Sequence, residues 1–277
     1  MKALKIFFIL LVFLFCTLGM SNGAIAGEIT FTAVSDVNLK ADKVNNSMTP
    51  SINNLLKAAD DINHSGSDCV FFLGNNISGA NPYDLVMFSK AINKIQKPIY
   101  TTIGNRDVQK AKNLDKKEYF RLLNKFSKNK TSKLPCAKKI NGLVFIFMDG
   151  TNQMVSLPRG YFKDGELIIL EKYLTKYKNE NVIIIQHFPV ADMKEEIKNT
   201  YNANDYKTIL KRHNNVIAVI SGNENEDFEI EDENGIKHIN VQSLSKSNEY
   251  KVINIRPVNK NINSKGFSIK TKIISVE

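Results

Sequence analysis

The chain has 277 residues, is 43% hydrophobic and carries a formal net charge of +10 at pH 7. This length suits one large domain or two small ones, and the apolar content is enough to bury a full core. Lysines are scattered singly and in pairs among many asparagines, without a dense run or interleaved aromatics, so the charge indicates a solvated surface and no nucleic-acid partner is expected.

The N-terminus has the order of a secretory signal peptide. Lys2 and Lys5 precede the apolar run 6–18, and Ala24-Ile25-Ala26 then offers a small-residue cleavage site. We therefore predict a signal peptide over residues 1–26 and one domain over residues 27–277. The protein is expected to be secreted, periplasmic or extracellular, with no stable membrane insertion after cleavage. The alternative is an uncleaved N-terminal membrane anchor, for which the apolar run is short.

Apolar, β-branched runs alternate with segments of helical period in the rest of the chain. Strands are predicted over residues 29–36, 69–76, 98–107, 143–150, 182–189 and 216–223. Apolar spacing predicts helices from Pro50 through Ile62, from Asn81 towards Pro98, over 167–177 and around 206–210. Two hairpins are expected to turn on Asn141-Gly142 and Asn234-Gly235. Strand–helix alternation of this kind predicts an α/β fold.

Two cysteines remain after residue 26. Cys69 lies in the apolar run CVFFLG, which favours a buried thiol over half of a disulfide. A bridge to Cys136 is allowed in an exported protein, but nothing in the spacing requires it.

Five of the predicted strands end in polar clusters. These read Ser35-Asp36-Val37-Asn38, Gly74-Asn75-Asn76, Gly104-Asn105-Arg106-Asp107, Gln186-His187-Phe188-Pro189 and Gly222-Asn223-Glu224-Asn225. Because the carboxyl ends of strands line the ligand crevice of an open α/β sheet, we expect the five clusters to converge on one site. One Gly-Asn pair is ordinary turn chemistry, whereas the ordered set is far more specific.

The ordered set resembles the calcineurin-like metallophosphoesterases over roughly residues 28–255. The family pattern runs Asp-x-His, Gly-Asp, Gly-Asn-His-(Asp/Glu), a lone His after a strand, and Gly-His-x-His. The resemblance implies an α/β, four-layer αββα sandwich with two mixed β-sheets flanked by helices. It also implies two divalent metal ions that share a bridging carboxylate and generate a hydroxide for attack on phosphorus.

Position by position, the resemblance places metal ligands at Asp36, Asn38, Asn75, Asn105, His187, Asn223 and Asn225, and the catalytic histidine at Arg106. Only Asp36, Asn105 and His187 keep the family residue. Asn75 replaces the bridging carboxylate, without which two neighbouring dications repel each other. The sequence thus predicts a metallophosphoesterase scaffold whose metal site is largely lost.

Alternatives remain open at the retained positions. The guanidinium of Arg106 either binds phosphate, sulfate or a carboxylate, or forms an ion pair with Asp36 or Asp107. Asp36 is either a strand-end hydrogen-bonding residue or a residual metal ligand. His187 is expected to be a buried imidazole if no metal remains, and the asparagines offer amide oxygens that hold Ca²⁺ or Mg²⁺ weakly.

Three classes of function follow. The first is an exported pseudo-phosphoesterase, catalytically weak or inactive, that binds a phosphate-containing or other anionic small molecule and needs no cofactor. The second is an active hydrolase with a reduced ligand set, which would use Mn, Fe or Zn, or weakly Mg or Ca. The third is an interaction module with a vestigial crevice and an unidentified protein partner. A serine hydrolase or a kinase is not expected, because neither a Gly-x-Ser-x-Gly elbow nor a phosphate loop is present.

Overall fold

The computed structural model describes residues 27–43, 49–191, 200–223, 226–259, 261, 263 and 265–276. The predicted signal peptide lies outside these ranges. Within them, no helix is both long and apolar enough to cross a membrane.

The first β-sheet has five strands in the order β11-β10-β1-β2-β3. Their bounds are β1 Ile29–Val34, β2 Cys69–Phe72, β3 Ile99–Thr101, β10 Glu249–Pro257 and β11 Phe267–Ser275. Strands β1, β2 and β3 are parallel, whereas β10 is antiparallel to both β1 and β11. The three parallel strands therefore present their carboxyl ends at one edge.

The second β-sheet has six strands in the order β4-β5-β6-β7-β9-β8. Their bounds are β4 Cys136–Ile140, β5 Leu143–Phe147, β6 Val182–Ile185, β7 Val216–Ser221, β8 Phe228–Glu231 and β9 Lys237–Asn240. Strands β5, β6, β7 and β9 are parallel, and an antiparallel hairpin partner closes each end of the sheet. The first hairpin turns on Asn141 and Gly142, both at positive φ, as the two-residue turn requires.

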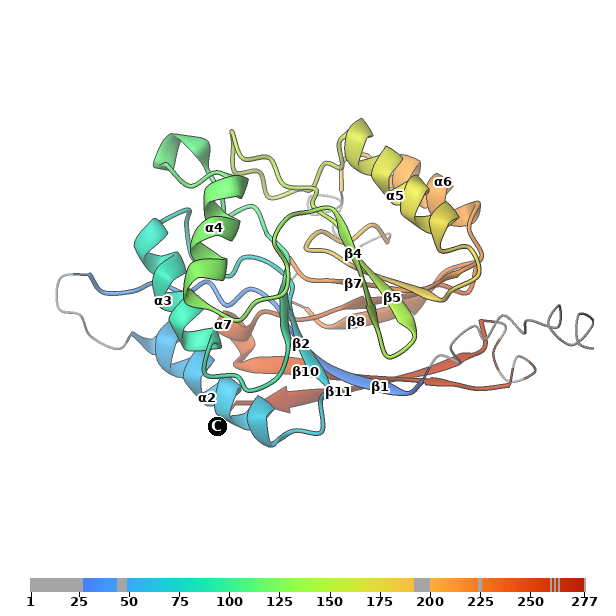
Figure 1. The fold of residues 1–277 in the computed structure, drawn as a ribbon, viewed down its shortest axis with the longest axis horizontal. Helices are drawn as coiled ribbons and strands as arrows, with labels where there is room; N and C mark the ends of the chain where they lie inside the picture. Colours follow the sequence, from blue (N-terminus) through green and yellow to red (C-terminus); the bar gives the residue numbers. More distant parts are fainter. Residues whose placement is uncertain are drawn as a thin grey trace, which may run out of the picture.

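Helices cover the outer faces of the two sheets (Figure 1). On the first sheet lie α2 Pro50–His64, α3 Pro82–Ile92 and α4 Lys116–Phe126, and on the second lie α5 Asp164–Lys176 and α6 Ala203–Lys211. A 3₁₀ turn, η1 Lys110–Lys112, and a short helix, α7 Leu244–Ser247, complete the described elements. The result is the predicted four-layer αββα sandwich of two mixed sheets.

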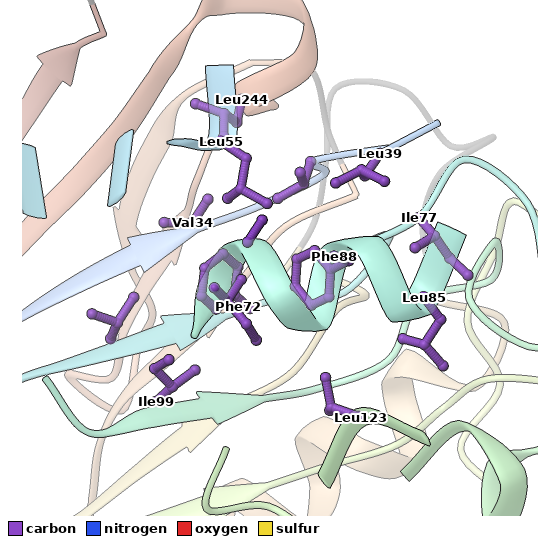
Figure 2. Packing of buried hydrophobic residues seen from close by; sticks show 14 of the residues in the cluster. Val34, Leu39, Leu55, Phe72, Ile77, Leu85, Phe88, Ile99, Leu123 and Leu244 are labelled. Atoms are coloured by element: carbon purple, nitrogen blue, oxygen red, sulfur yellow. The ribbon is translucent and has the colours of Figure 1, made fainter. Parts of the chain in front are cut away.

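Strict alternation along the central strands separates three apolar cores. In β2, Phe71 faces the space between the sheets, whereas Phe72 packs under α3 against Phe88 with ring centroids 5.3 Å apart (Figure 2). In β5, Phe145 faces the same inter-sheet space and Val144 packs under α5 and α6. A strand buried on both faces reads as a continuous apolar run, which explains the runs in the sequence.

Besides the short η1 and α7, the structure contains two longer elements that the sequence patterns did not predict. Helix α4 has a well-defined apolar face of Tyr119, Phe120 and Leu123, but the segment as a whole is polar and strongly basic, so it does not stand out as an apolar element. Its signal was the cap: Asp115 accepts a hydrogen bond from the backbone N–H of Glu118 (2.8 Å). Strand β11 is an edge strand rich in polar residues, which gives little hydrophobic pattern. Cys69 and Cys136 are buried and free.

Candidate functional site

The carboxyl ends of β1, β2 and β3 meet those of β6 and β7 at one edge of the paired sheets. Asn75 donates to Asp36 (Nδ2 to Oδ1, 2.8 Å), and the backbone N–H of Asn223 donates to Asp36 Oδ2 (3.1 Å). The backbone N–H of Arg106 donates to Asn75 Oδ1 (2.9 Å), and the Gly222 N–H donates to the His187 carbonyl (2.9 Å). Residues far apart in the sequence thus form one polar cluster, which we call the crevice cluster: Asp36, Asn38, Asn75, Asn105, Arg106, His187 and Asn223.

The backbone of the crevice cluster explains its abundance of asparagine. Asp36, Asn38, Asn75 and Asn223 have φ values of 50°, 47°, 52° and 67°, in the left-handed region. Asn and Asp tolerate this region better than other residues with a Cβ because their short polar side chains hydrogen-bond locally. The sharp turns after three strands are therefore encoded by these residues. Asn225 lies outside the described residues.

Asp36 has both of its carboxylate oxygens occupied by protein donors. Its side chain is buried, with 6% of the residue exposed. Oδ1 accepts the Asn75 amide, and Oδ2 accepts the Ser35 hydroxyl (2.6 Å) as well as the Asn223 backbone N–H. Ser35 was not among the predicted site residues, and its contact with the carboxylate is visible in the structure alone. Asp36 therefore accepts hydrogen bonds from the ends of two other strands and from its own neighbour Ser35.

The amide orientation of Asn75 is fixed from both sides. The Arg106 backbone N–H can only donate, so the amide oxygen must face it. An ionised Asp36 can only accept, so the amide nitrogen must face that carboxylate. Where the family has its bridging carboxylate, this chain thus presents an N–H donor to Asp36.

Arg106 makes neither of the ion pairs that the sequence suggested. Its guanidinium donates to Asn38 Oδ1 (3.3 Å), and within the described part of the chain it forms no salt bridge with Asp36 or Asp107. Asp107 is instead fully buried and accepts the backbone N–H groups of Gly104 (2.8 Å) and Ile77 (3.0 Å). Burial raises the pKa of Asp107 to about 7 despite these donors. The Arg106 side chain remains exposed at the crevice.

His187 is fully buried, and its ring has a defined tautomer. Nδ1 lies 2.9 Å from the Leu73 carbonyl, which can only accept, so Nδ1 carries the proton and Nε2 carries a lone pair in the neutral ring. Burial lowers the pKa of His187, which favours this neutral form; the Asp36 carboxylate opposes the shift. Nε2 is buried without a hydrogen-bond partner, and so is Asn105 Oδ1. Two acceptors of the crevice cluster are therefore unsatisfied by the described residues.

A loop over residues 151–160 covers one side of the crevice cluster. Ser156 donates to the Asn105 carbonyl (2.8 Å), Asn223 donates to the Pro158 carbonyl (3.1 Å), and Thr151 donates to the Ile103 carbonyl (3.2 Å). No pattern in the sequence pointed to this loop, because it has neither hydrophobic period nor a recognisable motif. Its contacts hold Asn105 and Asn223 in place.

A dinuclear metal centre does not fit these residues. Two dications need a shared anion, and among the described residues of the cluster only Asp36 is a carboxylate, which already accepts three hydrogen bonds from the protein. Among the described residues no group of three or more His, Cys, Asp or Glu side chains is arranged to hold a metal ion. The remaining donors, His187 Nε2 and amide oxygens, lack the charge to hold two ions.

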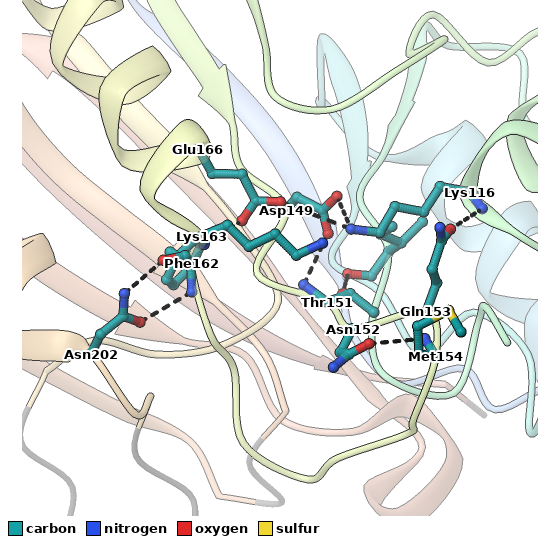
Figure 3. Close-up of polar contacts among 11 residues, drawn as sticks. Lys116, Asp149, Thr151, Asn152, Gln153, Met154, Phe162, Lys163, Glu166 and Asn202 are labelled. Atoms are coloured by element: carbon teal, nitrogen blue, oxygen red, sulfur yellow. Dashed lines mark hydrogen bonds and ion pairs between the residues drawn. The ribbon is translucent and has the colours of Figure 1, made fainter. Parts of the chain in front are cut away.

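A partly buried ionic cluster next to the loop joins three elements (Figure 3). Lys116 of α4 lies 2.5 Å from Asp149 Oδ2, after β5, and 3.9 Å from Glu166 Oε1 of α5. Burial, followed by repulsion from Asp149, raises the pKa of Glu166 to about 7. The folded state therefore favours the protonated acid relative to the unfolded chain, whose ordinary pKa is 4.5.

We expect Glu166→Gln to remove a slope in the pH dependence of stability. Because the pKa of Glu166 is raised in the folded state, its contribution to the free energy of unfolding is fully present below pH 4.5. That contribution is lost as pH rises through about 7. The variant should gain about 2 kcal/mol relative to wild type between pH 5 and pH 8. Gln keeps an acceptor for the Lys163 backbone N–H at the start of α5, so the capping contact survives.

Urea unfolding at pH 5, 6, 7 and 8 measures this effect. Glu233→Gln is the control, because Glu233 is exposed and pairs with Lys211 at the surface. Parallel curves for wild type and Glu166→Gln across this range would contradict the titration of Glu166.

Known proteins with the same fold support this architecture. A family model, calcineurin-like phosphoesterase, matches residues 29–224. No curated protein matches the sequence. Among solved structures, a dimetal phosphatase from Danio rerio is 14% identical with a TM-score of 0.63, over 90% of this chain and 99% of that one.

Two proteins of Thermus thermophilus have similar structures. TT1561 is 13% identical with a TM-score of 0.57, over 90% of this chain and 99% of that one. A 5'-nucleotidase precursor is 10% identical with a TM-score of 0.55, over 90% of this chain and 54% of that one. At these identities the structures establish the fold alone.

The fold, the ordered clusters and the family match define the class: the chain belongs to the calcineurin-like phosphoesterase family. Members of this family typically depend on divalent metals. This chain has the family's scaffold, and the placement of Asn75 and Arg106 at the positions of the bridging carboxylate and the catalytic histidine stays a prediction from the sequence.

Proposed function

We propose that the chain is an exported pseudo-phosphoesterase, catalytically weak or inactive, that binds a phosphate-like anion at the crevice cluster. One observation carries the loss of catalysis: the residue at the bridging position, Asn75, donates a hydrogen bond to Asp36 where a metal would need an anionic ligand. Export rests on the charge order of the N-terminal sequence.

Anion binding is supported by the state of Arg106. Its guanidinium is exposed and, among the described residues, has only the neutral oxygen of Asn38 as a partner. A planar fork without a carboxylate partner is suited to phosphate, sulfate or a carboxylate. Asn38 accepts a hydrogen bond from the guanidinium through its amide oxygen. Its amide nitrogen donates to the Ser245 hydroxyl (3.0 Å), which fixes the orientation of the Asn38 side chain.

The proposal is tested by turnover and by anion binding on the purified protein. We expect no metal-dependent hydrolysis of phosphomonoesters or phosphodiesters with added Mn²⁺, Zn²⁺ or Fe²⁺. Inorganic phosphate should bind in isothermal titration calorimetry, and Arg106→Ala should abolish that binding. Arg256→Ala, at an exposed arginine of β10, is the control and should bind phosphate as wild type does.

A second candidate is an active hydrolase with a reduced ligand set, using one divalent ion such as Mn²⁺, Fe²⁺ or Zn²⁺. The specific observation in its favour is that two buried acceptors, His187 Nε2 and Asn105 Oδ1, have no hydrogen-bond partner among the described residues and so keep lone pairs for a metal ion. Metal-dependent turnover by wild type that disappears in His187→Ala would establish this candidate and overturn the pseudoenzyme proposal.

A further inference from the structure

The net charge of the chain is concentrated in one segment. Residues 110–139 contain eleven Lys and Arg and two acidic residues, a formal charge of +9, whereas the whole chain carries +10. The rest of the chain is therefore almost electrically balanced. The lysines of this segment are spaced singly and in pairs, so no dense run marks them in the sequence. In the structure the segment forms η1, α4, the loop after α4 and β4, which brings the positive charges together.

A pocket of about 690 Å³ lies against this segment, between α4, the loop at residues 132–134 and Asp149. Pockets of roughly 300–1,000 Å³ accommodate small organic ligands. The lining residues on which the inference rests are Lys117, Phe120, Arg121, Lys125, Lys133 and Leu134. We call this feature the basic pocket. None of its lining residues belongs to the crevice cluster.

Helix geometry aligns the cations of the basic pocket. Lys117, Arg121 and Lys125 recur at i, i+4 and i+8 and so form one stripe along α4, within about 12 Å. Lys133 adds a further charge from the loop. Phe120, 5% exposed, and the half-buried Leu134 supply an apolar surface beside the stripe. The pocket thus combines several cations with an apolar wall.

Acidic side chains neutralise only part of this charge. Lys116 is paired with Asp149, and Arg121 is paired with Glu118 through two contacts of 2.5 and 2.6 Å. Lys117, Lys125 and Lys133 form no salt bridge with any described residue. Like charges held on one helix face repel each other, and an anionic ligand would relieve that repulsion.

We propose that the basic pocket binds a small organic ligand that carries several phosphate groups and an aromatic or apolar body, the chemical class of a nucleoside triphosphate. The lysines and Arg121 contact the phosphates, and the wall of Phe120 and Leu134 contacts the body of the ligand. Binding here is independent of the anion at Arg106, because the two sites share no residue. It falls steeply with ionic strength, since the cations are exposed.

Adenosine triphosphate, tripolyphosphate and adenosine are the probes, titrated into the purified protein at low salt. We expect adenosine triphosphate to bind at least about 10-fold more tightly than tripolyphosphate, which lacks the apolar body, and adenosine not to bind measurably. The double variant Lys117→Gln/Lys133→Gln should weaken binding of adenosine triphosphate by about 10-fold or more. Both residues are exposed and unpaired in the described chain, so the variant should fold normally.

Lys57→Gln/Lys94→Gln is the matched control, because it removes the same charge from exposed positions on α2 and after α3. It should bind adenosine triphosphate as wild type does. An equal loss in both double variants would show diffuse charge attraction and overturn the proposal, as would equal affinity for adenosine triphosphate and tripolyphosphate. Arg106→Ala should leave this binding unchanged; its loss in that variant would place the ligand in the crevice and also overturn the proposal.

Discussion

Asn75→Asp is expected to destabilise the protein by about 2–4 kcal/mol at pH 7 in the absence of divalent metal. The Asn75 amide nitrogen lies 2.8 Å from Asp36 Oδ1, so the new carboxylate would face an existing one at hydrogen-bond distance. The hydrogen bond is replaced by repulsion between two like charges at a buried position. Urea unfolding at pH 7 measures the change.

The same variant is expected to gain metal binding. Two carboxylates beside His187 Nε2 and Asn105 Oδ1 form a ligand set that the wild-type chain lacks, so Mn²⁺ or Zn²⁺ should raise the unfolding midpoint of Asn75→Asp and leave that of wild type unchanged. Asn113→Asp is the control, because Asn113 also has a positive φ (56°) but is exposed. If Asn75→Asp were as stable as this control without metal, the orientation of the Asn75 amide described here would be wrong.

Gly104→Ala is expected to cost about 3 kcal/mol, because it adds a methyl group where the strand ends of the two sheets meet. A Cβ at Gly104 would lie 2.5 Å from the Asn75 backbone nitrogen and 2.7 Å from His187 Nε2, closer than carbon approaches such atoms. The backbone after β2 and the buried His187 ring would both have to move. The effect is steric, since Gly104 does not have a positive φ.

Gly165→Ala makes the same chemical change as Gly104→Ala, but it is expected to stabilise the protein. Gly165 lies in α5, and a Cβ there would meet nothing within 4 Å. Ala is favoured over Gly inside a helix, so this variant should be more stable than wild type by about 0.5–1 kcal/mol. Thermal and urea unfolding of both variants test the contrast. A Gly104→Ala protein as stable as wild type would contradict the close approach of Asn75 and His187.

The sequence by itself determined the α/β class of the fold and the order of the strand-end clusters. Runs such as CVFFLG are apolar on both faces, and a strand of that kind must lie between two covered faces. The clusters follow those strands directly, so their meeting at one edge is a consequence of parallel strands. The identities of Asn75 and Arg106 were enough to predict the loss of the bridging carboxylate and of the catalytic histidine.

The tertiary structure decided what the replaced residues do. Asn75 turns its amide nitrogen towards Asp36 because the Arg106 backbone N–H requires the oxygen, and that N–H comes from a different strand end. Arg106 donates to Asn38, whereas the Asp107 carboxylate accepts hydrogen bonds from backbone N–H groups. These partners differ because Asp107 is fully buried and the Arg106 side chain is exposed. The basic pocket is likewise tertiary: lysines spread through residues 116–133 gather around one pocket because α4 aligns every fourth residue and the following loop returns to it. Pairings between distant residues and the burial of single side chains depend on the packed chain, and local sequence patterns do not encode them.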